Sequence, residues 1–147
     1  KHIDYSIALN NLGNIYSLLG DFKKAENSYL ESIKIKKVLS GENNIDYAKS
    51  LQNLGGVYSD FRKYDLTEKY FIQALKIFKE ISGENSYEYA KSLNDLGILY
   101  LNKSELNSAE KYLYGALDLR KKNLGENSIY YIYYSIMLLV VKILKMN

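Results

Sequence analysis

The sequence contains no cysteine, no proline and no tryptophan, and its single histidine is His2. Without cysteine the chain has no disulfide, no thiolate metal site and no thiol nucleophile. One histidine beside the first residue leaves little material for a nitrogen-ligated metal site or a catalytic dyad. A G-x-x-x-x-G-K phosphate-binding motif is also missing. These absences favour a protein that is not an enzyme and that carries no cofactor and no metal.

Neither sign of charge dominates the sequence. The formal net charge is +3, and the lysines are spread along the chain, so the charge pattern does not favour nucleic acid. A hydrophobic fraction of 47% and a charged fraction of 25% are typical of a folded chain, and 147 residues suffice for one ordinary domain. The missing cysteines suit a reducing compartment, and we expect a cytoplasmic location.

A stretch of a dozen residues is written three times at intervals of 42 positions. It reads YSIALNNLGNIY from Tyr5, YAKSLQNLGGVY from Tyr47 and YAKSLNDLGILY from Tyr89. Such a period is the signature of a repeat architecture. It predicts a single domain over 1–147 that contains repeats of about 1–42, 43–84 and 85–126, followed by a C-terminal helix over 128–146.

The pattern inside each repeat predicts two helices. Leu9, Leu12 and Tyr16 recur at i, i+3 and i+7, which places one apolar stripe on a helix. Gly13 lies within that stripe, where glycine costs about 1 kcal/mol relative to alanine. Because this glycine recurs in all three repeats, we expect the second helix to approach it closely. Such a helix–turn–helix cannot bury its apolar face alone and must stack on its copies.

The end of each repeat carries helix-capping signals. A left-handed glycine cap is expected at Gly41, Gly83 and Gly125. The asparagine two positions later is expected to be the N-cap of the next helix, at Asn43, Asn85 and Asn127. Glu88 is placed for a capping box with Asn85.

These residues resemble the tetratricopeptide repeat family. Its L-G-x-x-Y motif occurs at 12–16, 54–58 and 96–100, and a 42-residue repeat is similar to the long variant of kinesin light chains. The resemblance implies an all-α fold, an α-solenoid (right-handed superhelix) of about three repeats with an extra C-terminal helix. It also implies a non-catalytic scaffold that binds an extended peptide or partner protein on the concave face lined by the first helices. The family's junction proline is absent, and Asn44, Ser86 and Ser128 stand in its place.

The resemblance places the partner on the stripe beside the packing stripe of each first helix. The residues predicted to bind there are Asn10, Asn11, Asn14, Lys49, Gln52, Asn53, Lys91, Asn94 and Asp95. Amides offer both donors and acceptors, so they can pair with a peptide backbone without reading its sequence. The alternative is a polar inner face that is only solvated. A clamp for a C-terminal carboxylate, made by Asn14, Asn53 and Lys91, is disfavoured because Asp95 would repel the carboxylate.

The last segment, IYYIYYSIMLLVVKILKM over 129–146, is apolar on nearly every side. A membrane span needs about 20 apolar residues, and Lys142 interrupts this run early, so we expect no membrane. The segment keeps the register of a first helix, although Leu139 replaces the repeated glycine. We predict an association surface formed by Ile136, Leu139, Val140 and Ile143. Further repeats of a longer array, a second copy of the chain in a homo-oligomer, or a partner would cover it.

Two other functions stay open beside the scaffold. One is a regulatory segment of a larger protein that senses a peptide or small ligand. The other is single-stranded nucleic acid binding through stacked tyrosines, although Tyr16, Tyr58 and Tyr100 lie on the packing stripe. Glutamates that recur once per repeat, at Glu26, Glu68 and Glu110, indicate a structural or solvated role rather than a catalytic pair.

Overall fold

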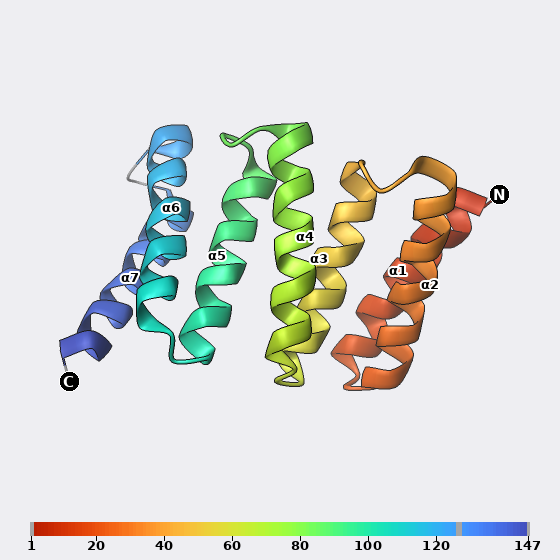
Figure 1. The fold of residues 1–147 in the computed structure, drawn as a ribbon, viewed down its shortest axis with the longest axis horizontal. Coiled ribbons are helices and arrows are strands. Elements are labelled where there is room, and N and C mark those ends of the chain that lie inside the picture. The colour runs from red at the N-terminus through yellow and green to blue at the C-terminus, as the bar shows by residue number, and fades with distance from the viewer. Residues whose placement is uncertain (1, 126–127, 147) are drawn as a thin grey trace. The chain divides into compact units, whose positions relative to one another are not determined.

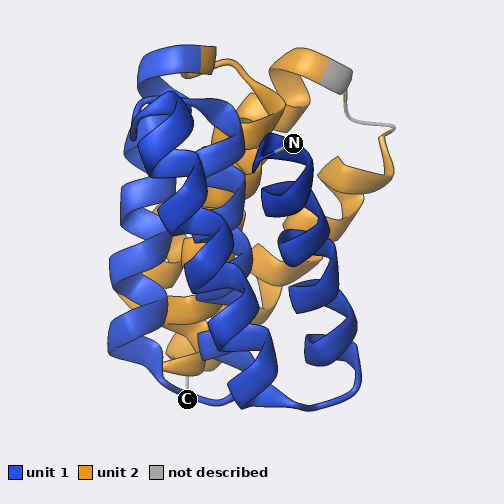
Figure 2. Ribbon diagram, turned by 90° about the vertical axis from the view of Figure 1, so that its right-hand side faces the viewer, with its two compact units in different colours: residues 1–81 blue, residues 82–147 orange. Residues whose placement is uncertain are grey.

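The computed structural model describes residues 2–125 and 128–146, and every regular element in those ranges is an α-helix (Figure 1). The helices are α1 (His2–Leu18), α2 (Phe22–Ser40), α3 (Ile45–Asp60), α4 (Tyr64–Ser82), α5 (Tyr87–Asn102), α6 (Leu106–Leu124) and α7 (Ile129–Met146). Three helix–turn–helix pairs are therefore followed by one more helix, which confirms the all-α helical-repeat prediction. The chain forms two compact units, Lys1–Ile81 (unit 1) and Ser82–Asn147 (unit 2), coloured separately in Figure 2. The assignment of 1–147 to a single domain stays a prediction.

The repeated glycine is the point at which the two helices of a pair meet. A Cβ atom added to Gly97 on α5 would lie 2.6 Å from Cγ of Leu113 and 3.2 Å from its backbone nitrogen on α6. At Gly55 on α3 the same atom would lie 2.6 Å from the ring of Phe71 on α4, and at Gly13 it would lie 2.9 Å from the ring of Tyr29 on α2. Real Cβ atoms do not tolerate such contacts, so only glycine permits this spacing. The close approach predicted from the repeat is confirmed.

The glycine caps are confirmed and the predicted N-caps are wrong by one position. Gly41, Gly83 and Gly125 have φ values of 75°, 82° and 75°. The side chain that caps the next helix belongs to the third residue after each glycine. Asn44 accepts from the Tyr47 N–H at 2.8 Å, Ser86 from the Tyr89 N–H at 3.2 Å, and Ser128 from the Tyr131 N–H at 3.1 Å.

The physical reason for the shift is backbone geometry. An N-cap residue has an extended backbone and bonds the N–H three positions on, and Asn44 meets both conditions, with φ −150° and ψ 156°. Its amide also donates to the Gly41 carbonyl at 2.8 Å, which ties the glycine cap to the helix start. Asn43 and Asn85 therefore precede the caps, and α5 is capped by Ser86 in place of Asn85. Asn127 lies outside the described residues.

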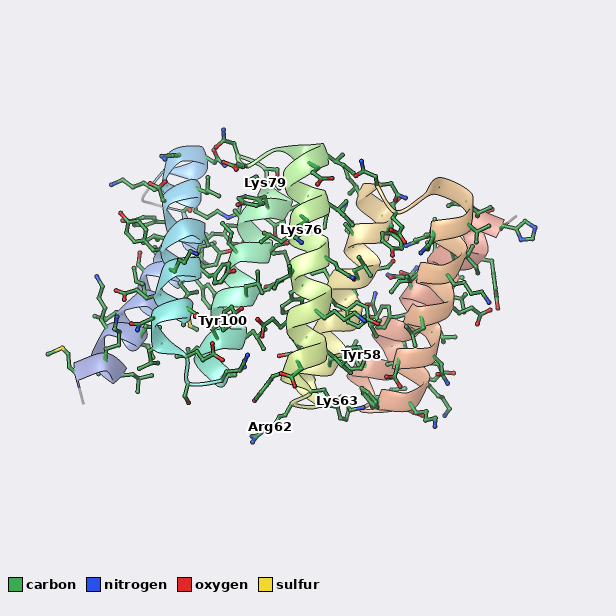
Figure 3. All side chains as sticks on the ribbon, in the orientation of Figure 1. Tyr58, Arg62, Lys63, Lys76, Lys79 and Tyr100 are labelled. Carbon is green, nitrogen blue, oxygen red and sulfur yellow. The ribbon has the colours of Figure 1, made fainter. Side chains whose placement is uncertain are left out.

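The repeated glutamates connect helices of neighbouring repeats. Glu26 on α2 accepts a hydrogen bond of 2.7 Å from the hydroxyl of Tyr58 on α3. Burial, and after it this bond, raises the pKa of Tyr58. Glu110 on α6 accepts from Lys145 on α7 at 2.6 Å. Figure 3 labels Tyr58 and Lys63 near one end of unit 1, where the Lys63 ammonium lies 4.0 Å from the ring centroid of Phe22. The bonds to Tyr58 and Lys145 give Glu26 and Glu110 a structural role.

Candidate functional site

In unit 1 the predicted site residue Asn10 is part of a largely buried polar network between α1, α2 and α3. The Ser50 hydroxyl donates to Asn10 Oδ1 at 3.1 Å, and the Lys36 ammonium donates to Ser50 Oγ at 2.7 Å. Lys36 is buried, and burial lowers the pKa of its ammonium group. Its remaining bond is to the Asp46 carbonyl at 3.3 Å. The Ser50 hydroxyl also lies 3.1 Å from the Asp46 carbonyl, so its single proton is shared between that oxygen and the Asn10 acceptor.

The other predicted residues of unit 1 differ in accessibility. Asn11, Asn14 and Lys49 are exposed, Asn53 is half-buried, and Gln52 is buried. Asn14 accepts a hydrogen bond from the Tyr29 hydroxyl, and burial raises the pKa of Tyr29 to about 12. Because Tyr29 is also the ring packed against Gly13, Asn14 helps to hold α2 on α1. Asn11 and Lys49 are the members of this set that solvent reaches most directly.

In unit 2 the three predicted residues Lys91, Asn94 and Asp95 line one cavity of about 450 Å³ between α5 and α7. Its other lining residues are apolar or aromatic: Tyr87, Ile129, Tyr130, Tyr133 and Tyr134. A mainly apolar hollow with a few convergent polar groups is the usual form of a binding pocket. The structure therefore brings three of the nine predicted residues together in one hollow.

The polar groups of this cavity are not all satisfied. The Lys91 ammonium and the Asp95 carboxylate lie 3.0 Å apart and form an i,i+4 ion pair. The side chain of Asn94 is only 6% exposed, and its Oδ1 has no hydrogen-bond partner. Leaving a buried acceptor unpaired costs roughly 1–3 kcal/mol, and such atoms are rare in folded proteins. The Oδ1 of Asn94 is therefore an unpaired acceptor that lies beside this cavity and is itself closed off from solvent.

Arg120 on α6 supports the tyrosines of the cavity. It is buried, and its guanidinium carbon lies 4.3 Å from the ring centroid of Tyr87 and 5.4 Å from that of Tyr130. Its Nη2 donates to the Tyr87 carbonyl at 3.2 Å, while its Nε has no partner. Burial raises the pKa of Tyr134, and a hydrogen bond with Arg120 opposes that shift. A cation stacked on two rings fixes the orientation of both.

Sequence reasoning missed Arg120 and the four tyrosines. A signal for Arg120 was present in the sequence. Arg120 shares a repeat column with Lys36 and Phe78, and a charged residue at a position that another repeat fills with phenylalanine indicates a specific partner. Three of the tyrosines, Tyr130, Tyr133 and Tyr134, lie on the last helix, whose departure from the repeat hid their role.

The four residues predicted as an association surface are all exposed on α7, and Leu139 is 57% exposed. The opposite face of this helix is buried, through Tyr134, Leu138 and Val141. Among the described residues α7 is also the helix that is long and apolar enough to cross a membrane by length and composition, and 17% of that window is buried. Length and composition do not separate a membrane span from an association helix, so both predictions about this surface stay predictions.

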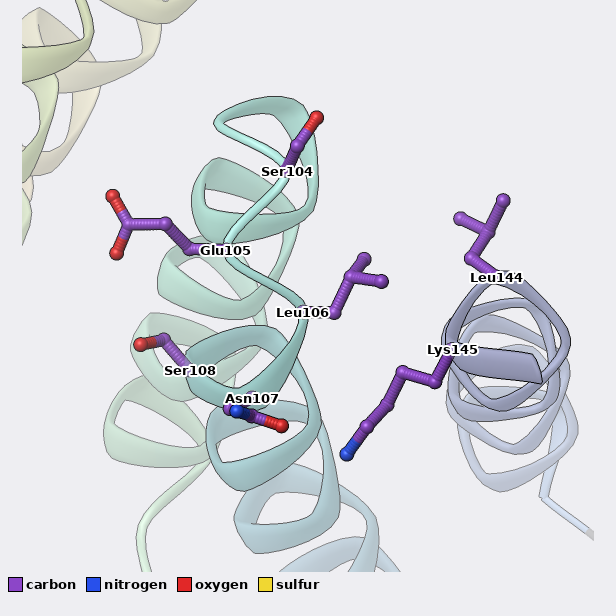
Figure 4. A pocket seen from close by; sticks show the side chains of 7 residues that line it. All are labelled: Ser104, Glu105, Leu106, Asn107, Ser108, Leu144 and Lys145. Atoms are coloured by element: carbon purple, nitrogen blue, oxygen red, sulfur yellow. The ribbon is translucent and has the colours of Figure 1, made fainter. Parts of the chain in front are cut away.

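A second cavity of unit 2, of about 570 Å³, contains none of the predicted residues (Figure 4). It lies between the start of α6 and the end of α7, where Leu144 and Lys145 approach Leu106 and Asn107. Lys145 is already paired with Glu110 at 2.6 Å. This cavity lacks a buried unpaired side-chain atom of the kind found at Asn94.

Helix pairs built around a repeated glycine, each followed by a capped junction, define a helical-repeat protein. A sequence model of the tetratricopeptide repeat matches residues 4–65 and 46–122, so the chain belongs to the tetratricopeptide repeat family. The family mediates protein–protein interaction, and its fold is a scaffold that is typically non-catalytic. No curated protein is significantly similar to the chain in sequence.

Solved structures share the fold. BtubC (BKLC) from P. vanneervenii is 27% identical over 92% of this chain and 54% of its own, with a TM-score of 0.85. A putative kinesin light chain with nearly identical TPR-like repeats from Podosopora anserina is 13% identical, covers 96% of this chain and 66% of its own, and has a TM-score of 0.85. The first TPR of Spaghetti (RPAP3), bound to the HSP90 peptide SRMEEVD, is 16% identical over 98% of this chain and 95% of its own, with a TM-score of 0.71. The chain therefore spans about half of BtubC and two thirds of the kinesin light chain.

Proposed function

We propose that this chain is a non-catalytic scaffold that binds an extended segment of a partner protein on the face lined by its first helices. Within unit 2 the binding site is the α5–α7 cavity that holds Lys91, Asn94 and Asp95. The observation that carries the proposal is the convergence of Lys91, Asn94 and Asp95 in one mainly apolar cavity. The Asn94 Oδ1 is unpaired and closed off from solvent, so a ligand would bond it once the side chain turns toward the cavity. The RPAP3 repeat with its HSP90 peptide supports it as an example of the same fold bound to a peptide.

The chemistry of the cavity selects the kind of ligand. An unpaired carbonyl oxygen accepts an N–H or an O–H, and the most frequent donor along a peptide is the backbone N–H. The tyrosines around it, Tyr130 and Tyr133 among them, offer flat apolar surface to a neighbouring side chain of the ligand. Since Lys91 and Asp95 neutralise one another, the charge at this wall favours neither a strongly acidic nor a strongly basic segment.

The ion pair also argues against a carboxylate clamp. Lys91 would have to leave Asp95, 3.0 Å away, to bind a terminal carboxylate, and the remaining Asp95 would repel that group. Asn14, the second member of such a clamp, already accepts the Tyr29 hydroxyl. The proposal is therefore for a site that reads the peptide backbone within an extended segment.

The test begins with selection of binders from a random peptide display library on the immobilised chain. Each selected peptide is then synthesised with one backbone N–H at a time methylated, and its Kd is measured for the wild-type chain and for Asn94→Leu. We expect a single methylation to weaken binding to the wild type by roughly tenfold and to have no effect on Asn94→Leu. Binding that is equal for both proteins, whatever the methylation, would contradict the proposal. Gln52→Leu, at the matching position of α3 and outside this cavity, is the control. It should keep the loss of affinity caused by methylation.

A further inference from the structure

The exposed face of α7 carries a second pattern, which shares only Ile129 with the lining of the peptide site. Its residues follow one another at intervals of three, four, three, four and three positions: Ile129, Ile132, Ile136, Leu139, Ile143 and Met146. All six side chains are apolar, and each is between 51% and 84% exposed. Alternating steps of three and four are the a and d positions of a heptad repeat, with isoleucine at every a position. We call these six residues the α7 seam.

The seam lies opposite the face by which α7 packs in its own unit. Tyr134, Leu138 and Val141 are buried, while the seam points away from them. Lys145, also off the seam, is paired with Glu110 of α6. Because α7 is already folded against α6, a partner at the seam would not have to supply the cost of forming this helix, which is large for an isolated helix of 18 residues.

The seam does not fit a second helix like those of the three repeats in this chain. Leu139 stands in the column of Gly13, Gly55 and Gly97, where even a methyl group would lie 2.6–2.9 Å from the incoming side chain. A leucine there keeps a facing helix at the larger distance of knobs-into-holes packing. The occupant that fits is a helix with a matching 3–4 apolar spacing, and α7 itself has that spacing.

We propose that the α7 seam pairs two copies of this chain through an antiparallel α7–α7 contact, an interaction beyond the proposed peptide site. An antiparallel two-fold pairing places each a residue opposite a d residue, in three layers that repeat by symmetry. The layers are Ile129 with the partner's Met146, Ile132 with the partner's Ile143, and Ile136 with the partner's Leu139. All six positions of one seam then meet an apolar residue of the other.

The charges on α7 favour this direction over a parallel one. The helix has no acidic residue, and its two lysines, Lys142 and Lys145, both lie near its C-terminal end. A parallel pair would bring both exposed Lys142 ammonium groups and both helix C-termini to the same end. In the antiparallel pair Lys142 instead borders the partner's Ser135, whose hydroxyl oxygen can accept a hydrogen bond. Like charges are kept apart along the length of the helix.

The absence of cysteine makes the contact measurable by cross-linking. Single variants Ile132→Cys and Ile143→Cys are prepared, and each is oxidised alone and as a mixture. We expect disulfide-linked dimers in the mixture, because positions 132 and 143 face one another, and at least tenfold less in either variant alone. Cross-linking of each variant with itself, with none added by mixing, would overturn the antiparallel assignment and indicate a parallel pair.

The association itself is tested by light scattering across a concentration series. We expect the unmodified chain to dimerise, Ile136→Glu to raise the dimer dissociation constant by roughly 100-fold, and Val38→Glu to leave it unchanged. Val38 is an exposed apolar residue on α2, outside the seam. Mixing Ile136→Lys with Leu139→Glu should restore dimers, because only an antiparallel pair sets those two side chains in one layer. An unmodified chain that is monomeric at every concentration would refute the proposal. A monomer that binds phosphatidylcholine vesicles in a flotation assay would refute it as well.

Discussion

Replacement of Asn94 by leucine tests whether its amide serves the stability of the fold or the binding of a ligand. The side chain is 6% exposed, and its Oδ1 has no partner, so removing the amide removes a destabilising group. Relief of a buried unpaired acceptor is worth roughly 1–3 kcal/mol, and leucine has a similar size and adds buried apolar surface. We therefore expect Asn94→Leu to raise the free energy of unfolding by about 1–3 kcal/mol.

Urea denaturation followed by circular dichroism measures this change through the transition midpoint, with the slope as a check that the unfolding reaction is the same. Each kcal/mol should also raise Tm by roughly 4 °C for a chain of this length. Gln52→Leu is the matched control, because Gln52 occupies the same repeat column, is equally buried and is engaged in an interaction. That substitution should lower stability, since it removes a contact that the protein uses.

The combination of higher stability and lost peptide binding would mark Asn94 as a residue kept for a ligand. Asn94→Leu that is less stable than the wild type would refute the reasoning, because the amide would then be stabilising. A gain in stability with unchanged peptide binding would confirm that the acceptor is unpaired and would contradict its proposed role in binding. Opposite signs for the two leucine variants are the result that the structure predicts.

Substitutions at Gly55, Ser86 and Tyr29, each with a control, test the fold. Gly55→Ala places a Cβ 2.6 Å from a ring and should cost about 1–3 kcal/mol in urea denaturation, whereas Gly56→Ala next to it meets no atom within 4 Å and should stabilise by up to about 1 kcal/mol; equal effects would contradict the glycine contact. Ser86→Ala should cost about 1 kcal/mol and Ser86→Asn almost nothing, since asparagine keeps the capping acceptor, and a cost for both would argue against the cap. Burial raises the pKa of Tyr29 to about 12, so its contribution to stability is complete below pH 10 and is lost as pH rises toward 12. Tyr29→Phe should move the onset of alkaline unfolding to higher pH, and Tyr114→Phe, at an exposed position, should not.

The helices and their order could be predicted because they depend on local pattern. The i, i+3, i+7 stripe and the glycine caps recur every 42 residues, so each repeat reports the same local structure three times. The glycine in the stripe even predicted the contact with the second helix, now visible at Gly97 and Leu113. The N-caps were placed one residue early, at Asn43 and Asn85, because several polar residues follow each glycine and the choice depends on backbone angles.

The candidate site was only partly predictable, as one repeat column shows. Asn10, Gln52 and Asn94 are equivalent in the repeat, and yet Asn10 is bonded to Ser50, Gln52 is buried and engaged, and Asn94 is buried and unpaired. The difference at Asn94 comes from its surroundings, since α7 and not another ordinary repeat stands beside α5 and brings tyrosines to the wall.

The sequence by itself therefore determined the period, the helix pairs, the junctions and the family, because these follow from local propensity and from periodic apolar residues. Only the tertiary structure decided which equivalent amide is left without a partner, which charged groups neutralise each other, and which face of α7 is buried and which exposed. Those outcomes depend on side chains that are distant in the chain and adjacent in space, and a repeat column does not contain that information.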